Sequence, residues 1–412
     1  MKIAVIGSGI SGLGSAYLLS KKYEVDLYEK ENRLGGHART TQIKEKNGTT
    51  FGVDTGFLVF NYQTYPLLTK LFEKLDVKIE KSDMSFGFWN TKTNIAYNGN
   101  SLKGIYFQKK NILSISHNRM IFDIIRFNKK ANKDLEQNSK ELNLTLKEYI
   151  KPYSKEFKNN YLIPMGACIW STASNKMNDF PIYTFLNFLK NHGLLGITTH
   201  HQWLTVSNGS INYVNKISKE ISGKIIKNSN LKSIKRENNK VILINDKNEN
   251  IIYDKVIFAI HAPDVLKLLE NPTKNERDIL SCFEYKENSA ILHNDNKALY
   301  PNKKIYAAWN YKTNNIQKEV TLSYYINKLQ NLKSKKDYFV SLNEISNINN
   351  PIEKIQYSHP QFTQKAIQAQ KRREEINGVD NIYYAGAYWR YGFHEDGLYS
   401  ANTIAKKFGC DM

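Results

Sequence analysis

The first twenty residues hold a short apolar segment that runs directly into a glycine-rich turn and then into a helical pattern. Lys2–Ile6 is rich in Ile and Val, which is typical of a strand buried on both faces. Gly7, Gly9 and Gly12 follow at once, and the apolar residues of Leu13–Leu19 recur at helical spacing. The three glycines permit a tight turn, close approach of the backbone to a pyrophosphate, and close packing of helix on strand. This order of elements predicts a dinucleotide held at a helix N-terminus.

A carboxylate at the end of the second predicted strand supports the same prediction. The strand Glu24–Tyr28 ends in Glu29, which lies 22 residues after Gly7. A carboxylate at this place can accept hydrogen bonds from both ribose hydroxyls, and it repels a 2′-phosphate. The glycine turn together with Glu29 is therefore much more specific than the glycines alone.

Composition excludes several other classes of protein. The 412 residues are 41% hydrophobic, enough for a sizeable core, and no uncharged apolar run is long enough to cross a bilayer. The three cysteines, Cys168, Cys282 and Cys410, are far apart, which favours a reducing compartment over a disulfide framework. The net charge of +20 fits either AT-rich codon usage or an anionic partner. Since no nucleic-acid-binding motif occurs, we expect no nucleic acid partner.

A second glycine pair follows the carboxylate and distinguishes FAD from NAD. The segment from Glu29 to Thr40 resembles the E-x-x-x-R-x-G-G-R-x-x-T motif of the flavin-containing amine oxidase and phytoene desaturase superfamily, with His37 in place of the second Arg. The segment Val53–Leu58 is similar to the later D-x-G element of that superfamily, which passes the flavin ring. The resemblance implies FAD as the cofactor.

The resemblance also implies the fold class. We expect an α/β protein with a Rossmann-type, glutathione-reductase-like FAD-binding domain and a discontinuous, mixed α+β substrate domain. Residues 1–60, 205–270 and 377–412 are assigned to the first domain, and residues 61–204 and 271–376 to the second, membrane-facing domain. The β-rich runs of 223–260 predict a β-meander that feeds a buried strand, with a small independent β unit as the alternative.

The chain ends as the superfamily does, with a strand up to Gly386, a loop and a closing helix. A helix N-terminus here would stabilise the negative charge of a reduced flavin, and Gly397 would give the backbone close access. The motifs and the resemblance together predict these cofactor-binding residues: Gly7, Gly9, Ile10, Ser11, Gly12, Glu29, Lys30, Arg33, Gly35, Gly36, His37, Ala38, Gly56, Phe57, Leu58, Leu231, Gly386, Glu395, Asp396, Gly397 and Leu398.

Over its full length the chain most resembles one branch of the superfamily, the bacterial proteins associated with cyclopropane-fatty-acid synthases and the amino-terminal flavin domain of plant cyclopropane synthases. That resemblance implies desaturation of a phospholipid acyl chain, with the methyl-branched chains of furan fatty acid synthesis as the closest assigned chemistry. It also implies a cytoplasmic enzyme, peripheral on the inner face of the cell membrane. Amine or carotenoid-type oxidation remains an alternative, as does a flavin-binding accessory subunit that presents lipid to a methyltransferase.

The residues beside the C-terminal motif are the candidates for chemistry, namely Trp389, Tyr391, His394 and Glu395. A desaturation loses a hydride and a proton, so we expect one base, for which His394 or Glu395 would serve. Bracing of the closing helix by these two residues is the alternative. His200, His201 and His293 are further candidates for the substrate pocket, but they lack metal-ligand spacing and we expect no metal.

The segment Lys109–Lys133 predicts a basic amphipathic helix. Its apolar arc comprises Leu113, Met120, Ile121, Ile124, Ile125 and Phe127, and its basic arc Arg119, Arg126, Lys130 and Lys133. Such a helix can lie in an anionic lipid interface, although packing against the core with a solvated basic side is the alternative.

Overall fold

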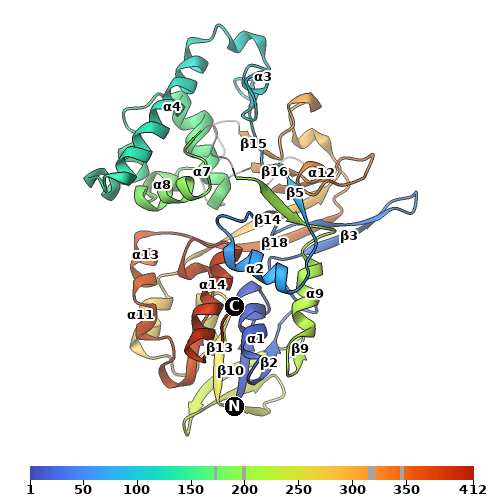
Figure 1. The fold of residues 1–412 in the computed structure, drawn as a ribbon, viewed down its shortest axis with the longest axis vertical. Helices are drawn as coiled ribbons and strands as arrows, with labels where there is room; N and C mark the ends of the chain where they lie inside the picture. The colour runs from blue at the N-terminus through green and yellow to red at the C-terminus, as the bar shows by residue number, and fades with distance from the viewer. Residues whose placement is uncertain (171–173, 197–200, 314–320, 344–347) are drawn as a thin grey trace.

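A computed structural model describes residues 1–170, 174–196, 201–313, 321–343 and 348–412 of the chain. It has two halves (Figure 1). One half is built on a parallel sheet and contains both ends of the chain, and the other is built on a larger mixed sheet with a group of helices. The FAD-type α/β fold class predicted from the sequence is confirmed.

The parallel sheet joins strands that are far apart in the sequence. In the described chain its order is β19-β13-β1-β2-β9 and every pairing is parallel. Its strands are β1 (Lys2–Ile6), β2 (Glu24–Tyr28), β9 (Ile225–Ile226), β13 (Lys255–Phe258) and β19 (Ile382–Tyr384). The central strand is β1, whose Ile and Val side chains are buried on both faces, as its composition predicts.

Helices pack on this sheet and place the first and last predicted motifs side by side. Helix α1 (Ile10–Leu19) follows β1 and packs along α14 (His394–Lys407), while α2 (Pro66–Lys74) packs on α14 from another side. The remaining helices of this half are α9 (Ile211–Lys219), α10 (Ala262–Leu268), α11 (Lys274–Leu280) and α13 (Gln364–Lys371). The N-termini of α1 and α14 therefore meet at the carboxyl edge of the sheet.

The predicted meander is present with one correction. Strands β10 (Leu231–Glu237), β11 (Lys240–Asn245) and β12 (Asn250–Tyr253) form an antiparallel sheet that leads into β13. The first β-rich run of that segment instead becomes β9, which pairs with β2 at the edge of the parallel sheet. Two apolar residues are too few to show in the sequence which sheet they join.

The second half is built on a sheet of order β18-β14-β17-β16-β15-β6-β7 in the described residues. All neighbours are antiparallel except β15 and β6, which are parallel. Its strands are β6 (Phe86–Asn90), β7 (Ile95–Asn98), β14 (Tyr285–His293), β15 (Trp309–Thr313), β16 (Thr321–Tyr325), β17 (Phe339–Leu342) and β18 (Glu353–Pro360).

Helices from the middle of the chain stand beyond this sheet (Figure 1). They are α3 (Leu102–Ile105), α4 (Ile115–Glu136), α5 (Leu146–Tyr149), α6 (Lys155–Phe157), α7 (Ile163–Trp170) and α8 (Ile182–Asn191). The short helix α12 (Ile326–Leu329) lies at the mixed sheet itself, where it joins β16 to β17. The predicted helix over 109–133 thus begins later, at Ile115, because Ser114 caps it through a bond from the His117 N–H, and it continues to Glu136. In the described chain no helix has both the length and the apolar character needed to cross a bilayer.

Two short ribbons connect the halves, β3 (Thr40–Lys44) with β4 (Thr50–Asp54) and β5 (Ile79–Ser82) with β8 (Trp203–Val206). The buried carboxylate of Asp54 accepts hydrogen bonds from Thr40 Oγ1 at 2.5 Å, Ser210 N at 2.9 Å and Gln330 Nε2 at 3.0 Å. These partners come from three separate parts of the chain. Burial raises the pKa of Asp54 to about 6 despite these donors.

The apolar cores do not follow the predicted boundary at residue 60. Ile43, Phe51 and Val53 pack in the core of the mixed sheet, whereas Leu68 and Phe72 of α2 pack in the core of the parallel sheet. The chain therefore crosses between the halves more than once within its first 75 residues.

Candidate functional site

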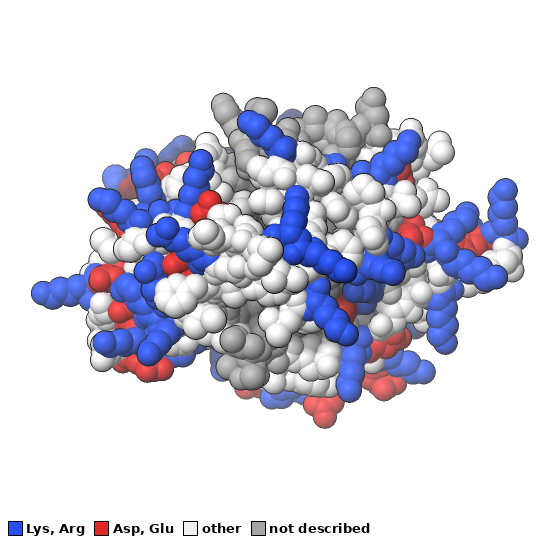
Figure 2. Space-filling view, turned by 90° about the horizontal axis from the view of Figure 1, so that it is seen from above, with Lys and Arg blue, Asp and Glu red and all other residues white. Residues whose placement is uncertain are grey.

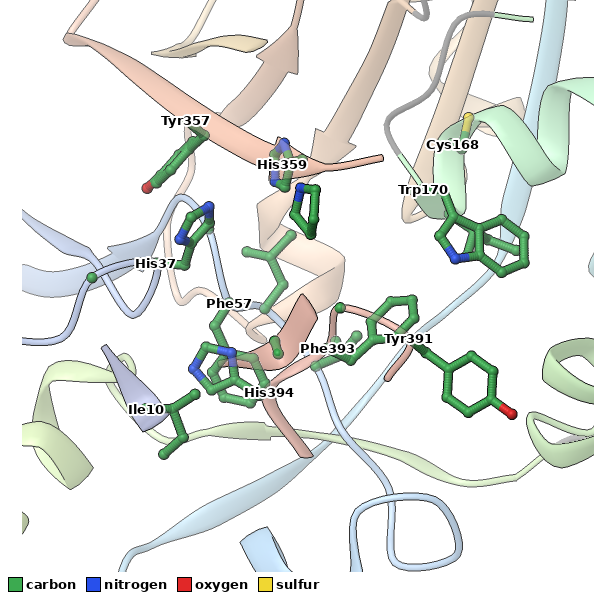
Figure 3. A pocket seen from close by; sticks show the side chains of 18 of the residues that line it. Ile10, His37, Phe57, Cys168, Trp170, Tyr357, His359, Tyr391, Phe393 and His394 are labelled. Carbon is green, nitrogen blue, oxygen red and sulfur yellow. The ribbon is translucent and has the colours of Figure 1, made fainter. Parts of the chain in front are cut away.

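One large cavity lies between the two halves and extends from the glycine turn to helix α4. Its volume is about 1780 Å³, and it is lined from β1, β18, α4, α7 and the N-terminus of α14, among other elements. Figure 3 shows part of the wall, with His37, Tyr357 and His359 on one side and Phe57, Tyr391 and His394 below. The cavity is large enough for a dinucleotide and a substrate together.

The glycine turn at one end of the cavity has the geometry that its sequence predicts. Gly7 has a φ of +99°, which L side chains rarely adopt. A Cβ on Gly12 would lie 1.8 Å from Gly7 O, so this glycine is what allows α1 to start so close to β1. A Cβ on Gly9 would meet nothing within 4 Å, and the open space above it belongs to the cavity. The turn therefore presents bare backbone to whatever occupies the cavity.

Glu29 stands at the edge of this turn, as predicted. Its Oε2 accepts hydrogen bonds from Ser8 N at 2.9 Å and Ser8 Oγ at 2.5 Å, and its Oε1 accepts one from Glu31 N at 2.9 Å. The carboxylate is 9% exposed and lines the cavity. It therefore braces the turn and also faces the space where a ribose would lie.

The second glycine pair packs directly against the first. Gly35 N donates to Ser8 O at 3.0 Å, and a Cβ on Gly36 would lie 3.0 Å from Gly9 Cα. Beside them Arg33 Nη1 is buried without a hydrogen-bond partner among the described residues, although its Nε pairs with Glu31 at 3.0 Å. A buried donor of a guanidinium beside open backbone N–H groups suits a phosphate. The residues present thus fit a dinucleotide such as FAD.

The predicted cofactor residues divide into those that line the cavity and those that shape it. The lining set comprises Gly7, Gly9, Ile10, Ser11, Glu29, Lys30, Arg33, Gly36, His37, Gly56, Phe57, Leu58, Leu231 and Gly386. The remaining residues, which do not line it, are Gly12, Gly35, Ala38, Glu395, Asp396, Gly397 and Leu398. Gly12 has the packing role that its place in the turn predicts, and cofactor contact by the other six stays a prediction.

The carboxyls at the start of α14 illustrate the difference. Glu395 turns away from the cavity, and its oxygens accept hydrogen bonds from Leu67 N at 2.9 Å and Leu68 N at 3.0 Å. It caps α2, so its proposed role as a base is not supported by its position. Burial raises its pKa to about 7. Asp396 caps its own helix by accepting a hydrogen bond from Phe393 N at 3.0 Å, and burial raises its pKa to about 6.

Gly397 lies close to the first turn of α1. A Cβ there would lie 2.7 Å from Ile10 Cγ2 and 2.8 Å from Ser11 Oγ. The glycine thus lets α14 pack against the first turn of α1, and Leu398 continues this packing over Gly14. The predicted approach of the Gly397 backbone to the flavin stays a prediction.

Of the candidate catalytic residues, Tyr391 and His394 line the cavity and Trp389 does not. Trp389 is buried in the core, in contact with Phe283. His394 Nε2 is 2.9 Å from Tyr213 Oη, and its ring stacks on Phe57 with centroids 3.7 Å apart. Burial lowers the pKa of His394 to about 3. The ring is therefore neutral and braced on two sides, which favours the bracing alternative.

A cluster that the sequence interpretation missed lies on the opposite wall of the cavity. His37 stacks on Tyr357 at 4.9 Å and lies 5.2 Å from His359, measured between ring centroids (Figure 3). His37 Nε2 is buried without a hydrogen-bond partner among the described residues. Burial holds the pKa of His37 well below its ordinary value and lowers that of His359 to about 4. The spacing of two residues between Tyr357 and His359 on a strand is the signal that would have placed both on one face.

The half of the cavity away from the glycine turn is mainly apolar, with polar side chains such as Asn128, His192 and Gln202 among its lining residues. Its wall contains Leu102, Ile105, Ile121, Ile124, Ile125, Tyr161, Met165, Cys168, Ile169, Trp170, Phe188, Trp203, Trp309 and Tyr324. The carboxylate of Asp83 also lies on the wall, where it accepts a hydrogen bond from Ser85 N at 2.7 Å and faces Lys328 at 3.9 Å. This half suits a long hydrophobic ligand better than a charged one.

The other candidate histidines differ in whether they line the cavity. His201 lines the cavity, whereas His293 is fully buried in the mixed sheet and bonds to Ser341 at 2.8 Å. His200 lies outside the described residues. In the part of the chain that the structure describes, no group of three or more His, Cys, Asp or Glu side chains is placed to hold a metal ion.

Comparisons with known proteins agree with this geometry. Residues 5–75 match the family model of the NAD(P)-binding Rossmann-like domain. A 4,4′-diapophytoene desaturase of Staphylococcus aureus is 35% identical over 97 residues, which are 20% of this chain and 19% of that protein. The chain thus aligns with only about a fifth of that relative's length.

Solved structures match over nearly the whole chain. A candidate protoporphyrinogen oxidase of Exiguobacterium sp. 255-15 has a TM-score of 0.70 at 16% identity, covering 99% of this chain and 98% of that one. A fatty acid isomerase of P. acnes that produces CLA has a TM-score of 0.68 at 13% identity, covering 98% of both chains. Cyclohexylamine oxidase of Brevibacterium oxydans IH-35A has a TM-score of 0.66 at 13% identity, covering 99% of both. The chain therefore shares the fold of these oxidases and of the fatty acid isomerase, and residues 5–75 match an NAD(P)-binding Rossmann-like domain.

Proposed function

We propose that the protein is an FAD-dependent oxidoreductase that desaturates the acyl chain of a phospholipid. The observation that carries the proposal is the continuity of the cavity, which extends from the glycine turn at Gly9 to the apolar wall at Ile121 and Ile124 of α4. A ligand that fills the apolar half would have one part of its chain beside the dinucleotide. A long hydrocarbon chain fits that shape, because it needs burial and few directed polar contacts.

The electrostatics of the cavity support a neutral chain over an ammonium group. Asp83, the carboxylate in the apolar half, is already bonded to Ser85 N and faces Lys328. The histidines on the wall, His37 and His359, are kept neutral by burial. The net charge of +20 also disfavours a cationic substrate in solution. These features weigh against amine oxidation, which the likeness to cyclohexylamine oxidase would otherwise suggest.

A methyl-branched, monounsaturated chain, as in furan fatty acid synthesis, is the substrate that we propose within this class. Its allylic C–H bond is weakened, and loss of that hydrogen as hydride with a proton from the neighbouring carbon leaves a conjugated diene. FAD, when bound, supplies the hydride acceptor in such a reaction. The protein's own part is to exclude water, to align the chain along the apolar wall and to accept the proton.

His37 is the side chain best placed to accept that proton. His37 lines the cavity and stacks on Tyr357, and its buried Nε2 has no hydrogen-bond partner among the described residues. His394, by contrast, has its Nε2 engaged with Tyr213. We therefore assign the proton to His37 Nε2 and a bracing role to His394.

The test is anaerobic mixing of the FAD-loaded protein with liposomes that do or do not contain a methyl-branched unsaturated lipid. We expect bleaching of the oxidised flavin band only with that lipid, together with a product two hydrogen masses lighter. Bleaching by carotenoid precursors or by simple amines, and by no phospholipid, would overturn the proposal in favour of those substrates. Lipid binding without any turnover would instead favour an accessory subunit that presents lipid to a methyltransferase.

A further inference from the structure

We propose that the α3–α4 end of the molecule is a docking surface for an anionic lipid leaflet, and that acyl chains enter the cavity through it. The docking surface is defined as residues 101–129, from the cap of α3 to the middle of α4. Docking itself stands on the features of this segment alone. The entry route rests in addition on the function proposed above.

Large apolar side chains are exposed on this segment to an unusual degree. Leu113 and Ile115 are 89% and 86% exposed, and Phe122 is 63% exposed. Six of the thirteen exposed large hydrophobic side chains of the described residues fall in this segment: Leu102, Ile112, Leu113, Ile115, Phe122 and Ile125. Scattered apolar residues on a surface need no explanation, whereas a cluster of this kind marks an interaction site.

The opposite face of α4 is fixed in the core, so the exposed residues cannot turn inward. Met120 and Phe127 are 1% and 0% exposed and pack in the core of the mixed sheet. The apolar arc predicted from the sequence is therefore divided: these two residues serve the core, whereas Leu113 and Ile125 face outward. Burial of the outward group requires something outside the chain.

The charges around the exposed apolar residues select an anionic partner. Lys103, Lys109, Lys110, Arg119, Arg126 and Lys129 are all exposed within the docking surface. Asp123 is the one acidic residue of the segment. It is 2% exposed and is neutralised by Arg126 at 3.0 Å and by a hydrogen bond from Ser154 N at 2.8 Å. Figure 2 looks onto this end of the molecule and shows basic side chains distributed around uncharged surface.

The same segment forms one wall of the cavity. Leu102, Ile105, Ile121, Ile124 and Ile125 line it, and Leu102 and Ile125 are at the same time exposed to solvent, at 73% and 52%. The cavity therefore reaches the surface among the apolar residues of the docking surface. An acyl chain leaving a leaflet at this place would pass from lipid to the apolar wall without crossing water.

A lipid leaflet is the occupant that matches all of these features. Apolar side chains at the tip with basic side chains around them are typical of segments that insert into the headgroup boundary and bind anionic lipid. A partner protein would have to cover the cavity mouth and would block the entry of substrate. A leaflet covers the mouth and supplies the substrate at once.

The experiment is co-sedimentation of the FAD-loaded protein with vesicles of phosphatidylglycerol and phosphatidylcholine. We expect binding to the mixed vesicles, with an affinity at least about tenfold weaker for phosphatidylcholine alone and for the double variant Leu113→Gln, Ile115→Gln. The matched control, Ile252→Gln with Val379→Gln, removes two exposed apolar side chains near the meander and should bind as the unchanged protein does.

A charge test is independent of the apolar one. Lys109→Glu with Lys110→Glu should weaken binding to anionic vesicles about as strongly, whereas Lys232→Glu with Lys247→Glu on the meander should not. Binding should also fall in 1 M salt, where the Debye length is about 3 Å. Absorbance of the bound flavin and the thermal midpoint should be equal in all four variants, since every substituted side chain is exposed.

The outcomes separate docking from function. Equal vesicle binding by the Leu113/Ile115 variant and its control would overturn the docking surface, as would absence of binding by the unchanged protein. A solution dimer that only this variant abolishes, with no vesicle binding, would overturn it in favour of a contact between two copies of the chain. Vesicle binding without flavin bleaching by any lipid would leave docking standing and overturn the proposed function alone.

Discussion

The imidazole ring of His37 lies stacked on the phenol ring of Tyr357, with centroids 4.9 Å apart and planes inclined by 28°. The stack holds His37 at the cavity wall, with its buried Nε2 free of any hydrogen-bond partner among the described residues. We expect His37→Phe to keep the stack and the bound flavin, and to lower the anaerobic rate of flavin reduction by about 10²-fold, because the proton acceptor is lost.

His37→Gln serves as the companion variant, since it places a polar amide near the same place but accepts no proton near neutral pH, so its rate should stay about as low as that of His37→Phe. Tyr357→Phe retains the ring and should reduce the rate little. A His37→Phe enzyme as fast as the unchanged one would remove His37 from the mechanism.

Gly9→Ala should damage cofactor binding without damaging the fold. Its backbone lies at φ −64° and ψ 177°, which alanine adopts freely, and a Cβ there meets no protein atom within 4 Å. The methyl group would instead stand where a pyrophosphate approaches. We expect the thermal midpoint of the cofactor-free protein to stay within about 1 °C and the FAD affinity, measured by titration, to fall at least about tenfold, or 1.4 kcal/mol. Unchanged affinity would contradict the placement of the cofactor.

Gly397→Ala should lower the stability of the folded protein, which Gly9→Ala should leave unchanged. The added Cβ would lie 2.7 Å from Ile10 Cγ2, so α14 must move away from α1. We expect the cofactor-free protein to lose about 1–3 kcal/mol of stability in urea unfolding, as overpacked cores do. Gly99→Ala is the matched control, because the nearest atom to a Cβ there is Phe86 O at 3.6 Å. Normal stability with a selective loss of flavin would instead support the direct flavin contact that the sequence suggested.

Glu29→Arg should weaken the retention of FAD by roughly 2–4 kcal/mol, because it removes a charged acceptor and adds bulk at the turn. Ser8 N and Ser8 Oγ would lose their acceptor at the same time. Glu24→Arg is a suitable control, since it makes the same substitution at the exposed start of β2, away from the cavity lining. The flavin that remains after gel filtration measures the effect, and full occupancy in Glu29→Arg would rule out the assignment.

Glu395 predicts a pH-dependent contribution to stability. Burial raises its pKa from 4.5 to about 7, so the folded state binds the proton more tightly than the unfolded state. This contribution is fully present below about pH 4.5, and it is lost as the pH rises through about 7. Relative to Glu395→Gln, the unchanged protein should therefore lose about 3 kcal/mol of unfolding free energy between pH 4.5 and about pH 8.

Urea unfolding of both proteins over this pH range measures that difference. The buried histidines titrate in both proteins, so their contribution cancels. Parallel stability curves would show that Glu395 is ionised throughout, held by the N–H groups of Leu67 and Leu68.

Features that depend on neighbouring residues could be predicted from the sequence. The turn at Gly7–Gly12 and the carboxylate of Glu29 belong to one local unit, in which strand, turn and helix impose their own spacing. The helix over 109–133 was predicted for the same reason, since its periodicity lies within a single element. Its first residue could not be predicted in the same way, because several polar residues of the segment could cap the helix and the structure uses Ser114.

Features that depend on distant partners could not be predicted. Glu395 was expected to act as a base because it lies beside the flavin motif, but its partners Leu67 and Leu68 are more than 300 residues away. Gly397 likewise depends on its contact with Ile10 and Ser11 of α1. Which residues of an amphipathic helix face the core and which face outward also requires knowledge of what surrounds the helix.

The order of the parallel sheet has a consequence for the synthesis of this protein. Residues 3–6 of β1 pair with residues 255–258 of β13, which in turn pair with residues 382–384 of β19. The parallel sheet that carries the glycine turn is therefore incomplete until residue 384 has been synthesised, and β1 stays unpaired on its β13 side for some 250 residues. Such non-local pairing slows folding and leaves apolar edges open meanwhile. FAD must load late, and a cell that produces this protein faster than FAD can reach it should accumulate aggregate rather than soluble apoprotein.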